Sequence, residues 1–131
     1  MTESAKAECP HHITVLVAED EAIIRQMIVD LLEQEGYNVL QAGDGAQAWK
    51  LFEENREQIQ LIITDILMPE MSGIELRTRI CDVSPTTKVL FISGYVREET
   101  CHTVGLQKTE VLLTKPFSVE TMLTKVREMS D

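Results

Sequence analysis

Four of the five short apolar runs in this sequence are followed at once by side chains that could do chemistry. Glu19 and Asp20 follow the first run, Asp65 the third, Ser93 the fourth and Lys115 the fifth. Carboxylate oxygens without a nearby His or Cys favour a hard divalent cation, Mg²⁺ above all. A carboxylate can also act as a nucleophile and take up a phosphoryl group as an acyl phosphate. These residue types therefore predict an anion site beside a metal ion, with Asp65 as the potential nucleophile.

Each of these residues also has an ordinary structural explanation. Glu19 and Asp20 could simply charge the start of a helix, where its dipole stabilises acids. Asp65 could be a turn residue, Ser93 could belong to a plain loop, and Lys115 could be a surface charge. Their convergence favours a site, because crowded carboxylates repel one another unless a cation compensates them.

The apolar runs have the character of buried strands. They are rich in Val, Ile and Leu, and several are nearly continuous rather than alternating, which is typical of parallel strands covered on both faces. We expect strands over residues 13–18, 37–42, 59–64, 88–92 and 110–114.

Helical patterns separate the predicted strands. The first helix ends at Gly36, and the second, third and fifth open at the capping residues Asp44, Ser72 and Ser118. The residues expected to face inward are Ile24, Met27, Ile28, Leu31 and Leu32 in the first helix, Ala48, Leu51 and Phe52 in the second, Leu76, Ile80 and Val83 in the third, and Val119, Met122, Leu123 and Val126 in the fifth. The fourth pattern, over 96–104, has no clean apolar stripe and is expected to be the most mobile element.

Strict alternation of strands and helices predicts a parallel sheet with helices on both faces. Right-handed crossovers and five strands indicate an α/β, flavodoxin-like doubly wound sheet with strand order 2-1-3-4-5. In such sheets ligands bind outside the carboxyl ends of the strands, which is where the acids, the hydroxyl and the lysine fall.

Length and charge restrict the class of protein. The 131 residues are enough for one domain, which we place at 13–131 after a flexible lead-in at 1–12. A net charge of −10 argues against direct binding of DNA or RNA. The apolar runs are too short for membrane insertion, and the first residues lack the apolar core of a secretory signal, so a cytoplasmic location is expected. The three cysteines are widely spaced and predict reduced thiols.

With these residues placed, the sequence resembles a response-regulator receiver domain of two-component signal transduction over about residues 13–129. The motifs that carry the resemblance are the acidic pair Glu19-Asp20, TDILMPEMSG at 64–73, FISGY at 91–95 and LTKPF at 113–117. Each motif alone is weak, but the four occur in the right order at the right strand ends.

The resemblance implies a role for each acidic residue. Asp65 resembles the phosphoacceptor, and Glu19 and Asp20 resemble the acidic pair that holds Mg²⁺ together with Asp65 and the backbone carbonyl of Leu67. The cofactor expected from the family is therefore Mg²⁺.

The resemblance also assigns the remaining strand-end residues. Ser93 occupies the switch position, and Lys115 occupies the position of the phosphate-contacting lysine, whose peptide bond to the following Pro116 is commonly cis in the family. The sequence departs from the family at Leu112, where many receivers carry an aromatic residue that rotates with the switch hydroxyl.

A phosphorylation-dependent signalling switch is the function that the resemblance implies. The donor would be a phosphohistidine on a sensor histidine kinase or a histidine phosphotransfer protein. The response would be a changed surface on the fourth predicted helix (96–104), the fifth predicted strand (110–114) and the fifth predicted helix, which begins at Ser118. A downstream protein target would recognise this surface. The domain would be a self-phosphorylating acceptor rather than an enzyme with a turnover substrate. Both a stand-alone receiver and a fragment of a hybrid histidine kinase fit, and the oligomeric state is open.

Three other classes share part of the pattern. A receiver-like module that binds a partner without phosphorylation would keep the fold. A Mg²⁺-dependent phosphohydrolase also uses an Asp at a strand end, but it resembles D-x-D after the first strand, whereas Glu21 and Ala22 follow Asp20 here. A flavodoxin-type electron carrier would want a Ser/Thr/Gly-rich phosphate loop where this chain has three acids, which would repel the FMN phosphate.

Overall fold

The strands and helices alternate over residues 13–93, as the apolar pattern predicts. The computed structural model describes residues 13–68, 70–93, 112–114 and 117–130. The strands are β1 (Thr14–Ala18), β2 (Asn38–Ala42), β3 (Ile59–Asp65), β4 (Lys88–Ser93) and β5 (Leu112–Thr114). The helices are α2 (Ala22–Gln34), α3 (Gly45–Glu54), α4 (Gly73–Val83) and α6 (Val119–Ser130). The fourth predicted helix, over 96–104, lies outside the described residues.

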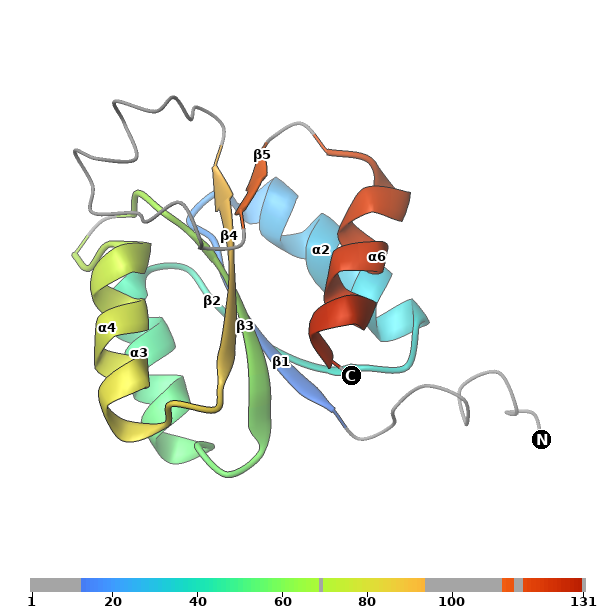
Figure 1. Ribbon diagram of the computed structural model, residues 1–131. Helices are drawn as coiled ribbons and strands as arrows, with labels where there is room; N and C mark the ends of the chain where they lie inside the picture. Colours follow the sequence, from blue (N-terminus) through green and yellow to red (C-terminus); the bar gives the residue numbers. More distant parts are fainter. Residues whose placement is uncertain (1–12, 69, 94–111, 115–116, 131) are drawn as a thin grey trace.

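The five strands form one parallel sheet in the order β2-β1-β3-β4-β5, which confirms the predicted order. Helices α2 and α6 cover one face, and α3 and α4 cover the other (Figure 1). The doubly wound α/β architecture is therefore confirmed, and the carboxyl ends of all the strands lie at one edge of the sheet.

Side chains cap the helices where the sequence indicates. The oxygens of Asp44, Ser72 and Ser118 each accept a hydrogen bond from the backbone amide three residues later, at 2.7, 3.1 and 3.0 Å. Each cap satisfies an amide that has no partner within its helix, which stabilises a helix start by about 1 kcal/mol. At the end of α2, Gly36 adopts a φ of 96°, the left-handed conformation that the predicted stop requires.

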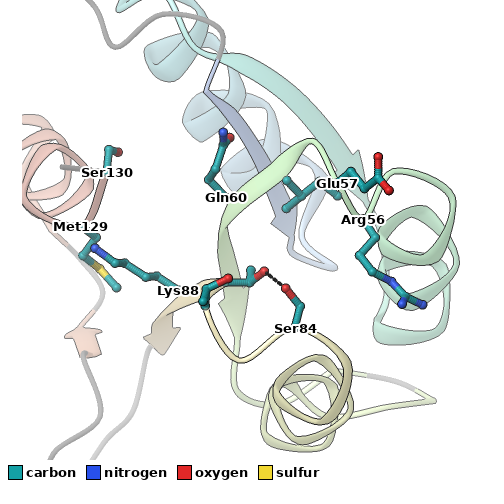
Figure 2. Close-up of a pocket in the computed structure, with 10 residues that line it drawn as sticks. Arg56, Glu57, Gln60, Ser84, Lys88, Met129 and Ser130 are labelled. Atoms are coloured by element: carbon teal, nitrogen blue, oxygen red, sulfur yellow. Dashed lines mark hydrogen bonds between the residues drawn. The ribbon is translucent and has the colours of Figure 1, made fainter.

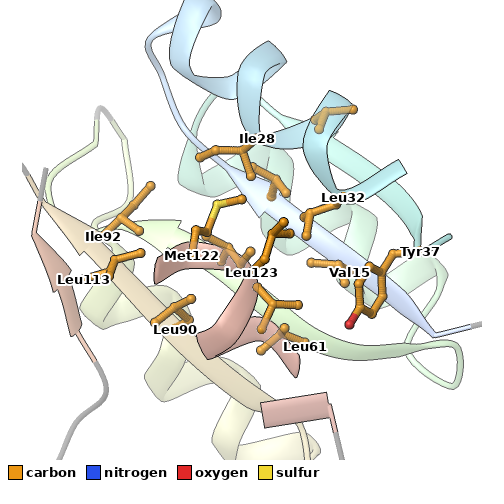
Figure 3. Packing of buried hydrophobic residues seen from close by; sticks show 14 of the residues in the cluster. Val15, Ile28, Leu32, Tyr37, Leu61, Leu90, Ile92, Leu113, Met122 and Leu123 are labelled. Atoms are coloured by element: carbon orange, nitrogen blue, oxygen red, sulfur yellow. The ribbon is translucent and has the colours of Figure 1, made fainter. Parts of the chain in front are cut away.

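Two apolar layers, one on each face of the sheet, form the core. Alternate residues of each strand enter opposite layers, which explains why the strands read as continuous apolar runs: Val15 and Val17 face α2 and α6, whereas Leu16 and Ala18 face α3 and α4. Figure 3 shows the first layer, in which Ile28 and Leu32 of α2 and Met122 and Leu123 of α6 meet strand residues.

The predicted inward faces of the helices are wrong at three positions. Met27, Val83 and Val119 are 42%, 41% and 46% exposed. Val83 is the last residue of α4 and Val119 the first of α6, so both lie at helix ends beyond the close contact with the sheet. In α2 the buried arc includes Val29, 3% exposed, and leaves Met27 at its margin.

A cavity of about 450 Å³ lies at the opposite, amino-terminal end of the strands, between the segments that lead into β3 and β4 and the end of α6. The Ser84 and Thr87 hydroxyls bond to each other at 2.7 Å. The long cationic side chains of Arg56 and Lys88 point away from each other (Figure 2), so they do not converge on one anion. Most of the residues that line the cavity are polar, but its two cations offer no single anion site (Figure 2).

Two further expectations concern membrane insertion and the state of the cysteine thiols. Within the described ranges, no helix combines the length and the apolar character needed to span a bilayer. Among the cysteines, Cys81 is exposed and carries a free thiol.

The loop between β3 and α4 contains a strained residue, Glu70, whose φ is 73°. A side chain in this left-handed region costs roughly 1–2 kcal/mol, which glycine avoids. We expect Glu70→Gly to raise the free energy of unfolding by about 1 kcal/mol in urea denaturation. Glu70→Ala is the control, because it keeps the Cβ and therefore the strain. Equal stability of the two variants would contradict this explanation.

Candidate metal centre

Three carboxylates meet at the carboxyl end of the sheet. Glu19 and Asp20 directly follow β1, and Asp65 is the last residue of β3. The two strands are neighbours, with Ala18 opposite Thr64, so the acids that are 46 and 45 positions apart in the chain lie side by side. One oxygen from each of Glu19, Asp20 and Asp65 lies within 4.8 Å of the others.

The burial of these carboxylates makes their mutual repulsion significant. Glu19 is 0% and Asp65 8% exposed, whereas Asp20 lies at the surface. Two ionised carboxylates whose oxygens lie within 4.8 Å repel by about 3 kcal/mol at an effective dielectric constant of about 20. A bound cation removes this electrostatic repulsion. Three carboxylate oxygens close together are a donor set that suits Mg²⁺. The residues present therefore fit a hard divalent cation.

Backbone contacts hold the segment that carries the first two acids. The Glu19 amide donates to the carbonyl of Ala42 at 3.1 Å, which ties the end of β1 to the end of β2. The Glu19 carboxylate accepts a bond from the amide of Glu21 at 3.1 Å, so its orientation is fixed locally. The guanidinium of Arg25, one turn into α2, donates to the Glu19 carbonyl at 2.7 Å.

A second set of contacts holds Asp65. Its carbonyl accepts a bond from the buried Thr64 hydroxyl at 2.9 Å. The next residue, Ile66, donates its amide to Ile92 of β4 at 3.2 Å and accepts a bond from the amide of Gly73 at 2.8 Å. A Cβ at Gly73 would collide with the Asp65 carbonyl oxygen, so the start of α4 packs directly on the backbone of the acid.

The other predicted site residues lie around this cluster. Ser93 is the last residue of β4 and is 5% exposed; because Asp65 is opposite Ile92, Ser93 lies one residue beyond Asp65 on the adjacent strand. Leu67 lies two residues after Asp65, with its side chain 60% exposed. Lys115 lies outside the described residues, as does its peptide bond to Pro116.

Two residues that contact this site were missed by the sequence reasoning. The sequence around Gly73 indicates only a helix cap, whereas its close approach to Asp65 depends on how α4 sits against β3. Arg25 lies one turn after the acidic residues, and this spacing in the predicted helix was the signal that could have found it.

Known proteins that resemble this chain share its sequence pattern and its fold. Residues 15–127 match the model of the response regulator receiver domain. The response regulator receiver protein CpdR of Brucella abortus is 34% identical over 88% of this chain and 94% of its own length. The sensor kinase CckA of the same organism is also 34% identical over 88% of this chain, which corresponds to only 12% of the kinase. Among solved structures, a response regulator receiver domain protein from Clostridium thermocellum superposes with a TM-score of 0.78, at 28% identity over 88% of this chain and 92% of that one.

Proposed function

The chain belongs to the response regulator receiver domain family, whose members serve phosphorylation-based signalling, and from this premise we propose that Asp65 is its phosphoacceptor and that Mg²⁺ is its cofactor. The observation that carries the proposal is the convergence of the Glu19, Asp20 and Asp65 oxygens within 4.8 Å at the carboxyl end of the sheet. We assign the receiver domain to residues 13–131.

In the proposed reaction, a carboxylate oxygen of Asp65 attacks the phosphorus of a phosphohistidine. The phosphorus–nitrogen bond breaks, its electron pair stays on the imidazole, and a new phosphorus–oxygen bond leaves Asp65 as an acyl phosphate. Glu19, Asp20, Asp65 and the carbonyl of Leu67 would hold Mg²⁺. When bound, the ion supplies positive charge that offsets the phosphoryl oxygens. We assign Ser93 and Lys115 to the remaining phosphoryl oxygens.

The proposed donor is a sensor histidine kinase or a histidine phosphotransfer protein. The names of relatives support this choice, since they include a sensor kinase and an autoinducer sensor kinase/phosphatase. Ile23 is 86% and Met27 42% exposed on α2, one turn apart and directly after the acidic residues. An apolar pair beside the acids is a suitable docking surface for the donor.

The proposed output is a population shift in the part of the molecule next to Ser93. Ser93 pairs with Thr114 of β5, so a movement of its hydroxyl toward the phosphoryl group would be felt by that strand. A surface formed by the fourth predicted helix (96–104), β5 and α6 would change and bind a downstream protein target. A few kcal/mol of differential binding is enough for such a two-state shift. The domain is itself the acceptor and needs no turnover substrate.

The proposal is tested by mass spectrometry of the intact protein after incubation with a small acyl phosphate. We expect one phosphoryl group per chain when Mg²⁺ is present and almost none when EDTA replaces it. Equal labelling with and without Mg²⁺ would refute the metal-dependent site. No labelling under either condition would favour a receiver-like module that binds its partner without phosphorylation.

Replacing Asp20 by Asn tests the electrostatic balance of the site. Removing one of three crowded negative charges should raise the thermal midpoint in EDTA by a few degrees and weaken Mg²⁺ binding at the same time. The measurements are thermal unfolding in EDTA and calorimetric titration with Mg²⁺. The matched control, Asp30→Asn, removes the same charge from the exposed surface of α2 and should change neither quantity appreciably. A loss of stability in D20N would contradict the repulsion argument.

A further inference from the structure

We propose that Arg25 is a positioning residue that holds the β1–α2 segment in the conformation required for metal binding; this inference rests on the proposed function. Arg25 is half-buried in the first turn of α2. Its Nη1 donates to the Glu19 carbonyl at 2.7 Å, and its Nε donates to the Gln41 side-chain oxygen on β2 at 3.2 Å. One planar group therefore joins the acidic segment, the helix that follows it and the edge strand.

The surroundings of Arg25 are shaped for this contact. The backbone N–H of Glu19 donates to Ala42 at the end of β2, and its backbone C=O accepts the bond from Arg25 in α2. Both backbone polar groups of Glu19 are therefore hydrogen-bonded. A Cβ at Gly43 would approach Nη1 to 3.3 Å, closer than an ordinary contact, so the glycine leaves room for the guanidinium. The amide of Gly43 is in turn held by Gln47 at 2.8 Å.

Positioning and simple electrostatics predict opposite effects of removing Arg25. As a positive charge near three carboxylates, Arg25 repels a divalent cation, so its loss through charge alone would tighten metal binding. As a positioning residue, it keeps Glu19 and Asp20 ordered before the metal binds. Its loss would weaken metal binding by the free energy needed to order the β1–α2 segment. The two hydrogen bonds of Arg25 go to a backbone carbonyl and a side-chain amide oxygen rather than to a carboxylate, as expected of a positioning residue.

Calorimetric titration with Mg²⁺ distinguishes the two explanations. We expect Arg25→Ala to bind Mg²⁺ about tenfold more weakly than the natural chain. Arg25→Lys keeps the charge but loses the planar pair of donors, and it should show a smaller loss. Gln41→Ala changes no charge and removes one bond from the exposed edge, and it should also weaken binding. The control, Arg127→Ala, removes the same charge from an exposed pair with Glu35 at 2.9 Å and should bind like the natural chain.

A second readout needs no metal. Hydrogen exchange in EDTA should be faster in R25A and Q41A than in R127A at the amides of Glu19 and Glu21. The hydrogen bonds of these amides lie in the β1–α2 segment that Arg25 holds. Unchanged or tighter Mg²⁺ binding in R25A, or unchanged exchange at these amides, would overturn the inference. Should R25A not fold, Q41A decides by the same measurements. If the natural chain itself bound no Mg²⁺, the proposed function would fail, and the exchange rates would still decide whether Arg25 orders the segment.

Discussion

An Asp65→Asn variant is expected to take up no phosphoryl group from an acyl phosphate in the presence of Mg²⁺, under conditions that label the natural chain fully. The amide oxygen is a far weaker nucleophile than a carboxylate and cannot form the stable acyl phosphate. The substitution also removes one of the three charges that favour the cation. Intact-mass spectrometry over a time course measures the effect.

The control for this variant is Asp82→Asn, which replaces an exposed carboxylate of α4 by the same amide. It should be labelled as fast and as completely as the natural chain. Acid-labile phosphate retained in D65N would show that another residue is the acceptor, and loss of labelling in D82N would show that the assay reports general damage.

A Gly73→Ala variant is expected to be about 3 kcal/mol less stable, although alanine is ordinarily the better helix former. The added methyl group would collide with the Asp65 carbonyl oxygen, and neither backbone can yield without moving the end of β3 or the start of α4. Urea denaturation measures the loss. Because the shift also displaces Asp65, we expect slower phosphorylation of whatever fraction remains folded.

The control for the Gly73→Ala variant is Gly43→Ala. A Cβ there meets the end of a flexible side chain, Arg25 Nη1, at 3.3 Å rather than a backbone atom. We expect a loss of stability below about 1 kcal/mol, since the side chain can shift slightly. Equal destabilisation by the two substitutions would mean that the contact between α4 and the Asp65 backbone is not tight.

The sheet could be predicted from the sequence because a buried parallel strand has a simple signature. Apolar runs between capped helices gave each described strand to within about two residues, and the alternation of elements then dictated the strand order. The convergence of Asp20 and Asp65 followed from the same rule, because parallel strands present their carboxyl ends at one edge. The direction of the strands alone brings these residues to the same edge.

What escaped prediction depends on how helices sit against the sheet. The exposure of Met27 and the burial of Val29 reflect the rotation of α2 about its axis, which its periodicity leaves uncertain by about one residue. The bond from Arg25 to the Glu19 carbonyl and the close approach of Gly73 to the Asp65 carbonyl are contacts between different elements. The spacing of Arg25 from the acids could have suggested the first contact, but no local pattern specifies the second. Lys115 and the fourth predicted helix lie outside the described residues.

A crystal structure of the protein grown with Mg²⁺ and beryllofluoride, a mimic of the acyl phosphate group, tests the central claim most directly. If the claim is right, the crystal will show a beryllium fluoride group bonded to a carboxylate oxygen of Asp65 and one metal ion in contact with Asp20 and Asp65. Beryllofluoride on a different residue, or a metal ion bound away from these carboxylates in a well-ordered crystal, would contradict it.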